Sequence, residues 1–360
     1  MRPFAVAFAV WLVLLHFLFR TDPHELVEPL AKGQLAAKRT ELRAYNPEWE
    51  LMGRLFAALS YANLAFEDRS YVEPLRQLAD ETDALERAHG PTSYLLPYGK
   101  HATQSLFVDG EIALMLAAKQ LHAGGDPTAL EDRIARIERQ LESAPLLLAE
   151  SYPDEGWVFC NTIAVAALKT SDAALGTDHS DIIARWLVSL KTHFVDPKTG
   201  MLVSSFHADG RHRDGPEGST LWLAAHMLQL VDEPFAKEQY ALARAHLGRG
   251  ALGFGWAAEW PREWEGGVDI DSGPTIPLVD ANAGSSGTAL LGAAAFGDDE
   301  WLRALVTSLR FAAFPTTDER GGLHFAAGNS LADAVTLYAL VQGPLWKCLQ
   351  RGTACSAPRS

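Results

Sequence analysis

The sequence predicts an all-α protein, an (α/α)6 toroid in which an inner ring of helices lies inside an outer ring. Two observations favour this fold class. Apolar residues recur at three- and four-residue spacing along most of the chain after residue 22, and helices with few charges alternate with amphipathic helices. A helix that is apolar on all sides is buried all round, whereas an amphipathic helix is half exposed. The alternation therefore places every second helix inside the ring.

Twelve segments carry a helical pattern, and little of the sequence has the pattern of a strand. The segments are 24–43, 47–66, 70–89, 108–123, 128–146, 158–170, 179–194, 218–231, 234–247, 275–295, 299–313 and 330–349. Start signals support two of them, because Asn46 before Pro47 and Asp126 before Pro127 are typical of helix N-termini. The inner helices are expected where Ala, Gly, Leu and Val dominate, at 108–123, 158–170, 218–231, 275–295 and 330–349.

Length and composition fit one large helical domain. The chain has 360 residues, of which 48% are hydrophobic and 21% charged, and this is enough apolar material for a large core. We predict a toroid domain over 22–350 and a flexible tail over 351–360. The net charge of -14 argues against a nucleic-acid partner, because phosphate binding needs clustered Lys and Arg. Whether the protein forms a homo-oligomer is left open.

The N-terminal segment 1–21 differs from the rest of the chain. Pro3 to Phe19 is an uncharged apolar run between Arg2 and Arg20, at the short limit for a membrane span. A signal peptide ends in a small-residue cleavage site, which the residues around Arg20 do not provide. We therefore predict an uncleaved helix that anchors the protein to a membrane, on an undetermined side. A signal peptide and an apolar helix docked on the toroid are the alternatives.

Long loops precede the inner helices and open at one end of the predicted toroid. They are rich in acids, Trp, His and Gly, and such loops on one rim indicate a functional face. The predicted catalytic residues are Asp109, Glu111, Asp154, Glu155 and Cys160. The predicted substrate-binding residues are Trp157, Asn161, His207, Asp214, Trp256, Asp269 and Asp271. We expect these side chains to converge on one cavity.

General acid–base chemistry needs one carboxyl that burial keeps protonated and a second that stays ionised. Glu111 and Asp154 each lie next to the start of a nearly uncharged helix, so we predict that they handle protons and that one is neutral near pH 7. Alternatives remain for each residue. Asp109 is also suited to cap its helix, and Cys160 to fill space as a small buried hydrophobe. The tryptophans near Trp256 suit either a sugar platform or packing under a long loop.

No metal or cofactor is expected. The rim histidines lack the spacing of a zinc site, and the chain has no nucleophile elbow, Walker A loop or dinucleotide fingerprint. The predicted partner is therefore a small-molecule substrate, and a membrane anchor suits one that is apolar.

Two motifs resemble the linalool dehydratase/isomerase family: Gly110-Glu-Ile-Ala-Leu-Met-Leu116 and Pro153-Asp-Glu-Gly-Trp-Val-Phe-Cys-Asn161. The likeness extends over 45–345. It implies an (α/α)6 barrel that adds or removes water on short terpenoid alkenols without a cofactor. It also implies a catalytic or pocket role for Cys160. The family's histidine falls on Glu111, and the family's second nearby cysteine has no counterpart in this chain.

Three functions follow from these observations. The first is a cofactor-independent lyase or isomerase that acts on an apolar alcohol or alkene. The second is an inverting glycoside hydrolase, because many (α/α)6 barrels pair two carboxyls across a tryptophan-lined cleft. The third is a non-catalytic, membrane-anchored binding protein.

Overall fold

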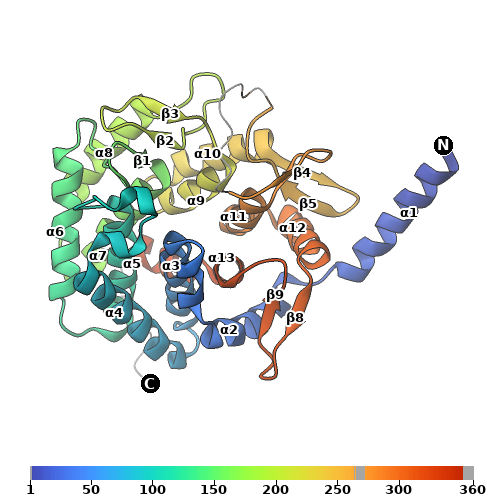
Figure 1. The fold of residues 1–360 in the computed structure, drawn as a ribbon, viewed down its shortest axis with the longest axis horizontal. Coiled ribbons are helices and arrows are strands. Elements are labelled where there is room, and N and C mark those ends of the chain that lie inside the picture. The colour runs from blue at the N-terminus through green and yellow to red at the C-terminus, as the bar shows by residue number, and fades with distance from the viewer. Residues whose placement is uncertain (1, 263, 265–271, 352–360) are drawn as a thin grey trace.

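Six largely buried helices form the inner ring of the computed structural model, which describes residues 2–262, 264 and 272–351. They are α3 (Pro47–Leu64), α5 (Leu106–Ala123), α7 (Val158–Leu175), α9 (Gly218–Leu228), α11 (Ala283–Ala295) and α13 (Ser330–Val341). Each packs against the next, and α13 packs against α3, so that the ring is closed (Figure 1). The five predicted inner segments all contribute to this ring, and α3 is the sixth member.

The outer ring consists of amphipathic helices that cover the inner ones (Figure 1). They are α2 (Val27–Ala36), α4 (Val72–His89), α6 (Thr128–Ser143), α8 (Ser180–His193), α10 (Glu233–Leu247) and α12 (Asp299–Ala312). In α6, for example, Leu130, Ile134, Ile137 and Leu141 are buried, whereas Glu131 is exposed. This three- and four-residue spacing is the pattern that predicted the outer helices.

A close approach between α5 and α7 fixes the geometry of one side of the ring. A Cβ added at Gly110 would lie 3.2 Å from Ala164, so the glycine lets the two helices pack with little space between them. α5 begins after Ser105, whose hydroxyl accepts a hydrogen bond from the backbone N–H of Val108 at 3.3 Å. The first turns of α5 and α7 therefore lie beside each other at the rim.

Short antiparallel strands occupy the rim loops, where the sequence had predicted no strands. β1 (Gly156–Trp157), β2 (Ser205–Phe206) and β3 (His212–Asp214) form a three-stranded sheet. Three hairpins follow: β4 (Gly248–Ala251) with β5 (Phe254–Ala257), β6 (Thr275–Ile276) with β7 (Ala281–Asn282), and β8 (Pro315–Thr317) with β9 (Leu323–Phe325). Strands this short carry too few alternating residues to produce a recognisable sequence pattern.

Three predicted helices are divided or shortened by other elements in the structure. The segment 275–295 is helical only from Ala283, because the β6–β7 hairpin comes first and Asn282 caps α11 by accepting the Ser285 N–H at 2.8 Å. The segment 330–349 breaks at Gly343 (φ 121°) into α13 and α14 (Pro344–Arg351). The segment 24–43 divides into the 3-10 helix η1 (Pro23–Leu26), α2 and the 3-10 helix η2 (Arg39–Ala44). Further 3-10 turns are η3 (Arg69–Tyr71), η4 (Pro91–Tyr94) and η5 (Pro97–Gly99).

α14 covers the end of the ring opposite the rim loops. Trp346 is buried there and stacks on His226 of α9 with ring centroids 5.1 Å apart, and the Leu345 N–H donates to Asn63 Oδ1 of α3 at 3.0 Å. A hollow of about 500 Å³ lies beside α14, lined in part by Asp22 and Arg303, and none of the predicted site residues lines it.

The N-terminal helix α1 (Arg2–Phe19) projects away from the rings (Figure 1). Near its end, the ring of Phe19 contacts Phe311 of α12 at 5.3 Å between centroids, and Arg310 donates to the Phe19 carbonyl at 2.9 Å. By length and hydropathy, Val6–Phe19 and Pro23–Ala36 pass as one membrane span only as a pair bent by 57°. α7 also passes the test, but 67% of it is buried inside the protein.

Candidate functional site

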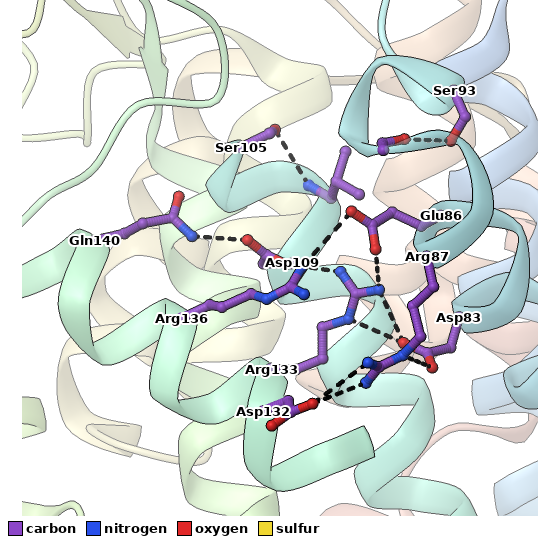
Figure 2. Close-up of polar contacts among 12 residues, drawn as sticks. Asp83, Glu86, Arg87, Ser93, Ser105, Asp109, Asp132, Arg133, Arg136 and Gln140 are labelled. Carbon is purple, nitrogen blue, oxygen red and sulfur yellow. Dashed lines mark hydrogen bonds and ion pairs between the residues drawn. The ribbon is translucent and has the colours of Figure 1, made fainter. Parts of the chain in front are cut away.

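Asp109 on α5 points outward, toward the outer helices α4 and α6. Figure 2 shows its carboxylate between Arg133 and Gln140 of α6, which donate to it at 2.7 and 2.8 Å. Arg133 is fully buried and also binds Asp83 and Glu86 of α4. The structure therefore places the predicted catalytic residue Asp109 in an ion-pair network behind the inner ring. Both of its oxygens are engaged there, and it is not brought together with Glu111.

Glu111 faces the interior of the ring. Two residues turn an α-helix by about 200°, so Glu111 lies on the face of α5 opposite Asp109. Its side chain is fully buried, and neither carboxyl oxygen has a hydrogen-bond partner among the described residues. Burial raises the pKa of Glu111 well above its usual value, and the negative charge of Glu48 raises the pKa further. The surroundings of Glu111 therefore favour its protonated carboxyl over the carboxylate.

The neighbouring inner helix α3 also carries two acids that lie two residues apart on opposite faces. Glu50 is fully buried and accepts hydrogen bonds from Arg43 at 2.5 Å and from Arg54 at 2.9 Å. Glu48 precedes it by two residues and so lies on the opposite face of α3. Glu48 is half-buried, and its charge acts on both Glu111 and Cys160. Each of these two neighbouring inner helices thus carries one acid that is paired with arginine and a second acid on the opposite face.

Sequence reasoning did not select Glu48 as a site residue. The Asn46–Pro47 start signal was recognised, and Asn46 does cap α3 by accepting the Glu48 N–H at 2.8 Å. However, this segment was not assigned to the inner ring. The signal that would have found Glu48 is the same one that selected Glu111, namely an acid in the first turns of an apolar helix.

Cys160 lies near the start of α7, in the electrostatic field of the same acids. Burial raises the pKa of the Cys160 thiol well above its usual value, and the negative charges of Glu111, Glu48 and Glu155 act in the same direction. A hydrogen bond with Ser151 opposes them only in part. Cys160 is therefore a neutral thiol and not a thiolate nucleophile.

We expect Cys160 to resist alkylation in the native protein, because the thiolate is the reactive form and the side chain is buried. Peptide mapping by mass spectrometry after treatment with iodoacetamide measures this, and protein unfolded in urea provides the control in which Cys160 reacts. Rapid modification of native Cys160 would contradict the assignment of a neutral thiol.

Aromatic side chains lie on the rim side of Glu111. Phe107 precedes Glu111 by one helical turn on the same face of α5. Its ring contacts Phe159 of α7 edge-on, with centroids 6.5 Å apart, and Phe159 contacts Trp157 at 6.0 Å. Of these three residues, only Trp157 was predicted. The faces of such rings attract cations, so this cluster is suited to stabilising positive charge near Glu111.

Glu155 and Trp157 belong to a polar cluster at the sheet β1–β2–β3. Glu155 is buried, accepts a hydrogen bond from the Trp157 indole N–H at 2.7 Å and forms an ion pair with Arg213 of β3. Tyr98 and Tyr152 stack beside this cluster at 4.4 Å between ring centroids. The cluster holds the Trp157 ring in place, and through Trp157 it adjoins the aromatic residues above Glu111.

Asp154 differs from the prediction. Its side chain is 72% exposed, and it accepts hydrogen bonds from the Ala208 N–H at 3.2 Å and from His207 at 3.2 Å. These hydrogen bonds, with Ala208 the larger contribution, lower the pKa of Asp154. Asp154 is therefore ionised and solvated. With a positive φ of 59°, it joins two rim loops and is not a buried proton donor.

The remaining predicted residues occupy separate positions on the rim. The amide of Asn161 bonds the backbone of Ala149 through both its oxygen and its nitrogen, so it fastens α7 to the preceding loop. Asp214 accepts a hydrogen bond from Ser205 at 2.5 Å, and Trp256 of β5 donates to the Val279 carbonyl at 2.7 Å. Asp269 and Asp271 lie outside the described residues. The roles assigned to all these residues stay predictions.

A family model for linalool dehydratase/isomerase matches residues 129–331, which is more than half of the chain. The chain belongs to the linalool dehydratase/isomerase family. The match includes three of the six inner helices, namely α7 with Cys160, α9 and α11, and it ends at the start of α13. No curated protein matches the sequence closely enough to report.

Solved structures similar to this family member share its double ring of helices. A glycosyl hydrolase family 88 protein from Bacteroides vulgatus aligns with a TM-score of 0.55 and 11% identity over 89% of this chain and 98% of its own. An unsaturated glucuronyl hydrolase from a Bacillus species aligns at 0.53, with 12% identity over 85% and 88%. An alpha-mannanase from Bacteroides thetaiotaomicron aligns at 0.51, with 14% identity over 84% and 87%. At these identities the likeness establishes the (α/α)6 toroid fold alone.

Proposed function

We propose that this member of the linalool dehydratase/isomerase family is a cofactor-independent lyase or isomerase that acts on a small apolar alcohol or alkene. The observation that carries the proposal is the carboxyl of Glu111, which is fully buried and has no hydrogen-bond partner among the described residues, so that burial raises its pKa. A buried carboxylic acid has a proton to donate at neutral pH, and its surroundings favour an apolar substrate over a sugar.

In this mechanism, Glu111 donates its proton to the hydroxyl oxygen of the substrate. The carbon–oxygen bond then breaks, water leaves with the bonding electrons, and a carbocation remains under the rings of Phe107 and Phe159. Glu48 takes a proton from the neighbouring carbon, and the electrons of that C–H bond form the double bond. Return of the proton from Glu48 to Glu111 completes the cycle, and the same steps in reverse hydrate an alkene.

The contrast between the two acids supports these roles. Glu111 is fully buried, whereas Glu48 is half-buried at the rim, so only Glu111 lacks the solvation that an ion needs. The charge of Glu48 further disfavours ionisation of Glu111. A buried carboxyl whose pKa is raised, next to a second carboxyl that is less buried, is an arrangement suited to acid–base chemistry.

Incubation of the protein with a panel of tertiary and allylic alkenols and a panel of oligosaccharides, analysed by mass spectrometry, tests the proposal. We expect loss or gain of water from alkenols. Cleavage of oligosaccharides alone would reject it in favour of the glycoside hydrolase alternative.

Replacing Glu48 with glutamine is expected to lower alkenol turnover by about a hundredfold, because the base that accepts the carbon-bound proton is lost. The matched control is Asp154→Asn, which changes a solvated acid of the rim loops and should leave turnover within about tenfold. Turnover by steady-state kinetics measures both. A larger loss in Asp154→Asn than in Glu48→Gln would contradict the assignment of Glu48 as the base.

We also propose that α1 anchors the protein to a membrane. Its 18 residues span about 27 Å, close to the thickness of a bilayer core, and its apolar side chains are exposed. Deletion of residues 1–21 is expected to move a folded protein from the membrane to the soluble fraction on ultracentrifugation, with circular dichroism as the control for folding. Membrane association that survives the deletion would contradict a simple anchor.

A further inference from the structure

Exposed apolar side chains gather where α1 leaves the rings. Besides those of α1 itself, they are Leu252, Ile276, Leu278, Val279, Phe311 and Phe314, and together we name them the α1-side surface. Leu278 is 97% exposed at the turn of the β6–β7 hairpin, and Phe314 is 65% exposed just after α12. Large apolar side chains at such exposure mark a surface that contacts something other than water.

Side-chain contacts and a hydrogen bond join these segments into one region. His16 of α1 contacts Phe254 in the β4–β5 hairpin at 6.1 Å between ring centroids, and Phe254 contacts Phe311 at 5.5 Å. The same hairpin holds the β6–β7 turn through a hydrogen bond from Trp256 to the Val279 carbonyl at 2.7 Å. Figure 1 shows the β4–β5 hairpin and α12 on the side of the rings from which α1 projects.

The β4–β5 hairpin packs closely against α1. Gly253 has a φ of 85°, and a Cβ added there would lie 2.3 Å from the ring of His16. The turn between β4 and β5 therefore approaches α1 as closely as the backbone allows. The neighbouring Leu252 remains 45% exposed beside this contact. The apolar surface of α1 thus continues onto the β4–β5 hairpin and the rings.

The other large apolar residues exposed in the described part of the chain do not form such a group. They are Leu35, Tyr45, Tyr98 and Val188, which lie on four different elements or loops. Val188 is 67% exposed on α8, which lies across the rings from α1 (Figure 1). Scattered residues of this kind are ordinary on a protein surface.

We propose that the α1-side surface is in contact with the lipid bilayer that α1 enters. α1 exposes apolar side chains over its length, and the surface continues this apolar character from the base of α1 to the turn at Leu278. The chain carries a net charge of -14, so attraction between basic residues and anionic lipids is not the main force. Insertion of apolar side chains into the interface is the mode that fits.

This contact has a consequence for access to the site. The β6–β7 turn leads into α11, one of the inner helices, so a rim loop would rest on the bilayer. An apolar substrate dissolved in the membrane would then meet the rim without crossing water. This consequence rests on the proposed function, whereas the contact with lipid does not depend on any reaction.

Fluorescence from labels on the full-length protein tests the contact. Leu278→Cys, Phe314→Cys and the control Val188→Cys are each labelled with an environment-sensitive fluorophore, and the signal of the labelled unsubstituted chain is subtracted. The proteins are reconstituted into phosphatidylcholine vesicles, with or without lipids that carry a nitroxide near the top of the acyl chain.

We expect the labels at 278 and 314 to emit at shorter wavelength and to be quenched by the nitroxide lipids, as at a depth of about 5–10 Å in the interface. The label at 188 should show neither change. Equal behaviour at all three positions would overturn the proposal. A wavelength shift without nitroxide quenching, together with energy transfer between differently labelled copies, would also overturn it and identify an interface between two copies of the chain. Because no activity is measured, failure here is distinguishable from failure of the proposed function.

Discussion

Replacing Glu111 with glutamine is expected to lower alkenol turnover by at least about a hundredfold. The amide keeps the size of the side chain but has no acidic proton to donate to a leaving hydroxyl. The control is Glu131→Gln, which changes an exposed acid of α6 and should leave turnover unchanged. Near-normal turnover in Glu111→Gln would reject the assignment and move attention to Asp269 and Asp271.

The pH dependence gives a second measurement on the same variant. Burial raises the pKa of Glu111 well above its usual value, so turnover that needs its proton falls as the pH rises through the raised pKa, and not near the usual pKa of a glutamic acid. For folding, the native state binds this proton more tightly than the unfolded state. Its stabilising effect is complete below the unfolded pKa of about 4.3 and is lost as the pH rises through the folded pKa.

Glu111→Gln cannot undergo this loss of stability. We therefore expect the stability of the wild-type protein relative to Glu111→Gln to fall as the pH rises from the unfolded pKa of about 4.3 toward the raised folded pKa, because the unfolded state then releases a proton that the native state still holds. Thermal unfolding of both proteins over a range of pH measures the difference. Parallel stability curves would show that Glu111 is already ionised or solvated in the native state.

Replacing Arg133 with methionine is expected to cost about 3–5 kcal/mol of the free energy of unfolding. Arg133 is fully buried and pairs with Asp83, Glu86 and Asp109, so its loss leaves buried carboxylates without their main partner (Figure 2). Arg136 contacts two of them only at 3.6 and 3.7 Å, which is too far to replace it.

Urea denaturation measures the cost. The control is Arg185→Met, which removes an exposed arginine paired with Asp181 and Glu142 and should leave the free energy of unfolding nearly unchanged. A cost for Arg133→Met as small as that of the control would show that the network relaxes or is hydrated. In that case the network would not explain why Asp109 points away from the ring interior.

The two rings of helices could be predicted because the pattern that indicates them, the distribution of apolar residues around each helix, lies within the helix itself. Whether a helix is apolar all round or on one face can be read from the residues within it, and α5, α7 and α9 were identified in this way. The hairpins were missed because their strands are two to four residues long. The start of α11 was misplaced for the same reason, since β6 and β7 precede it.

The sequence by itself determined the double ring of helices and the family. Two residues turn a helix by about 200°, so Asp109 and Glu111 lie on opposite faces of α5, although we had expected both side chains in one cavity. Only the tertiary structure decided which acid faces the interior. Arg133 and Gln140, both on α6, hold Asp109 outward, and Glu111 is buried without a hydrogen-bond partner in the part of the chain that the structure describes. Local pattern selected both Glu111 and Asp154, but a carboxyl's ionisation depends on neighbours that are distant in the chain, so only packing distinguished the buried Glu111 from the solvated Asp154.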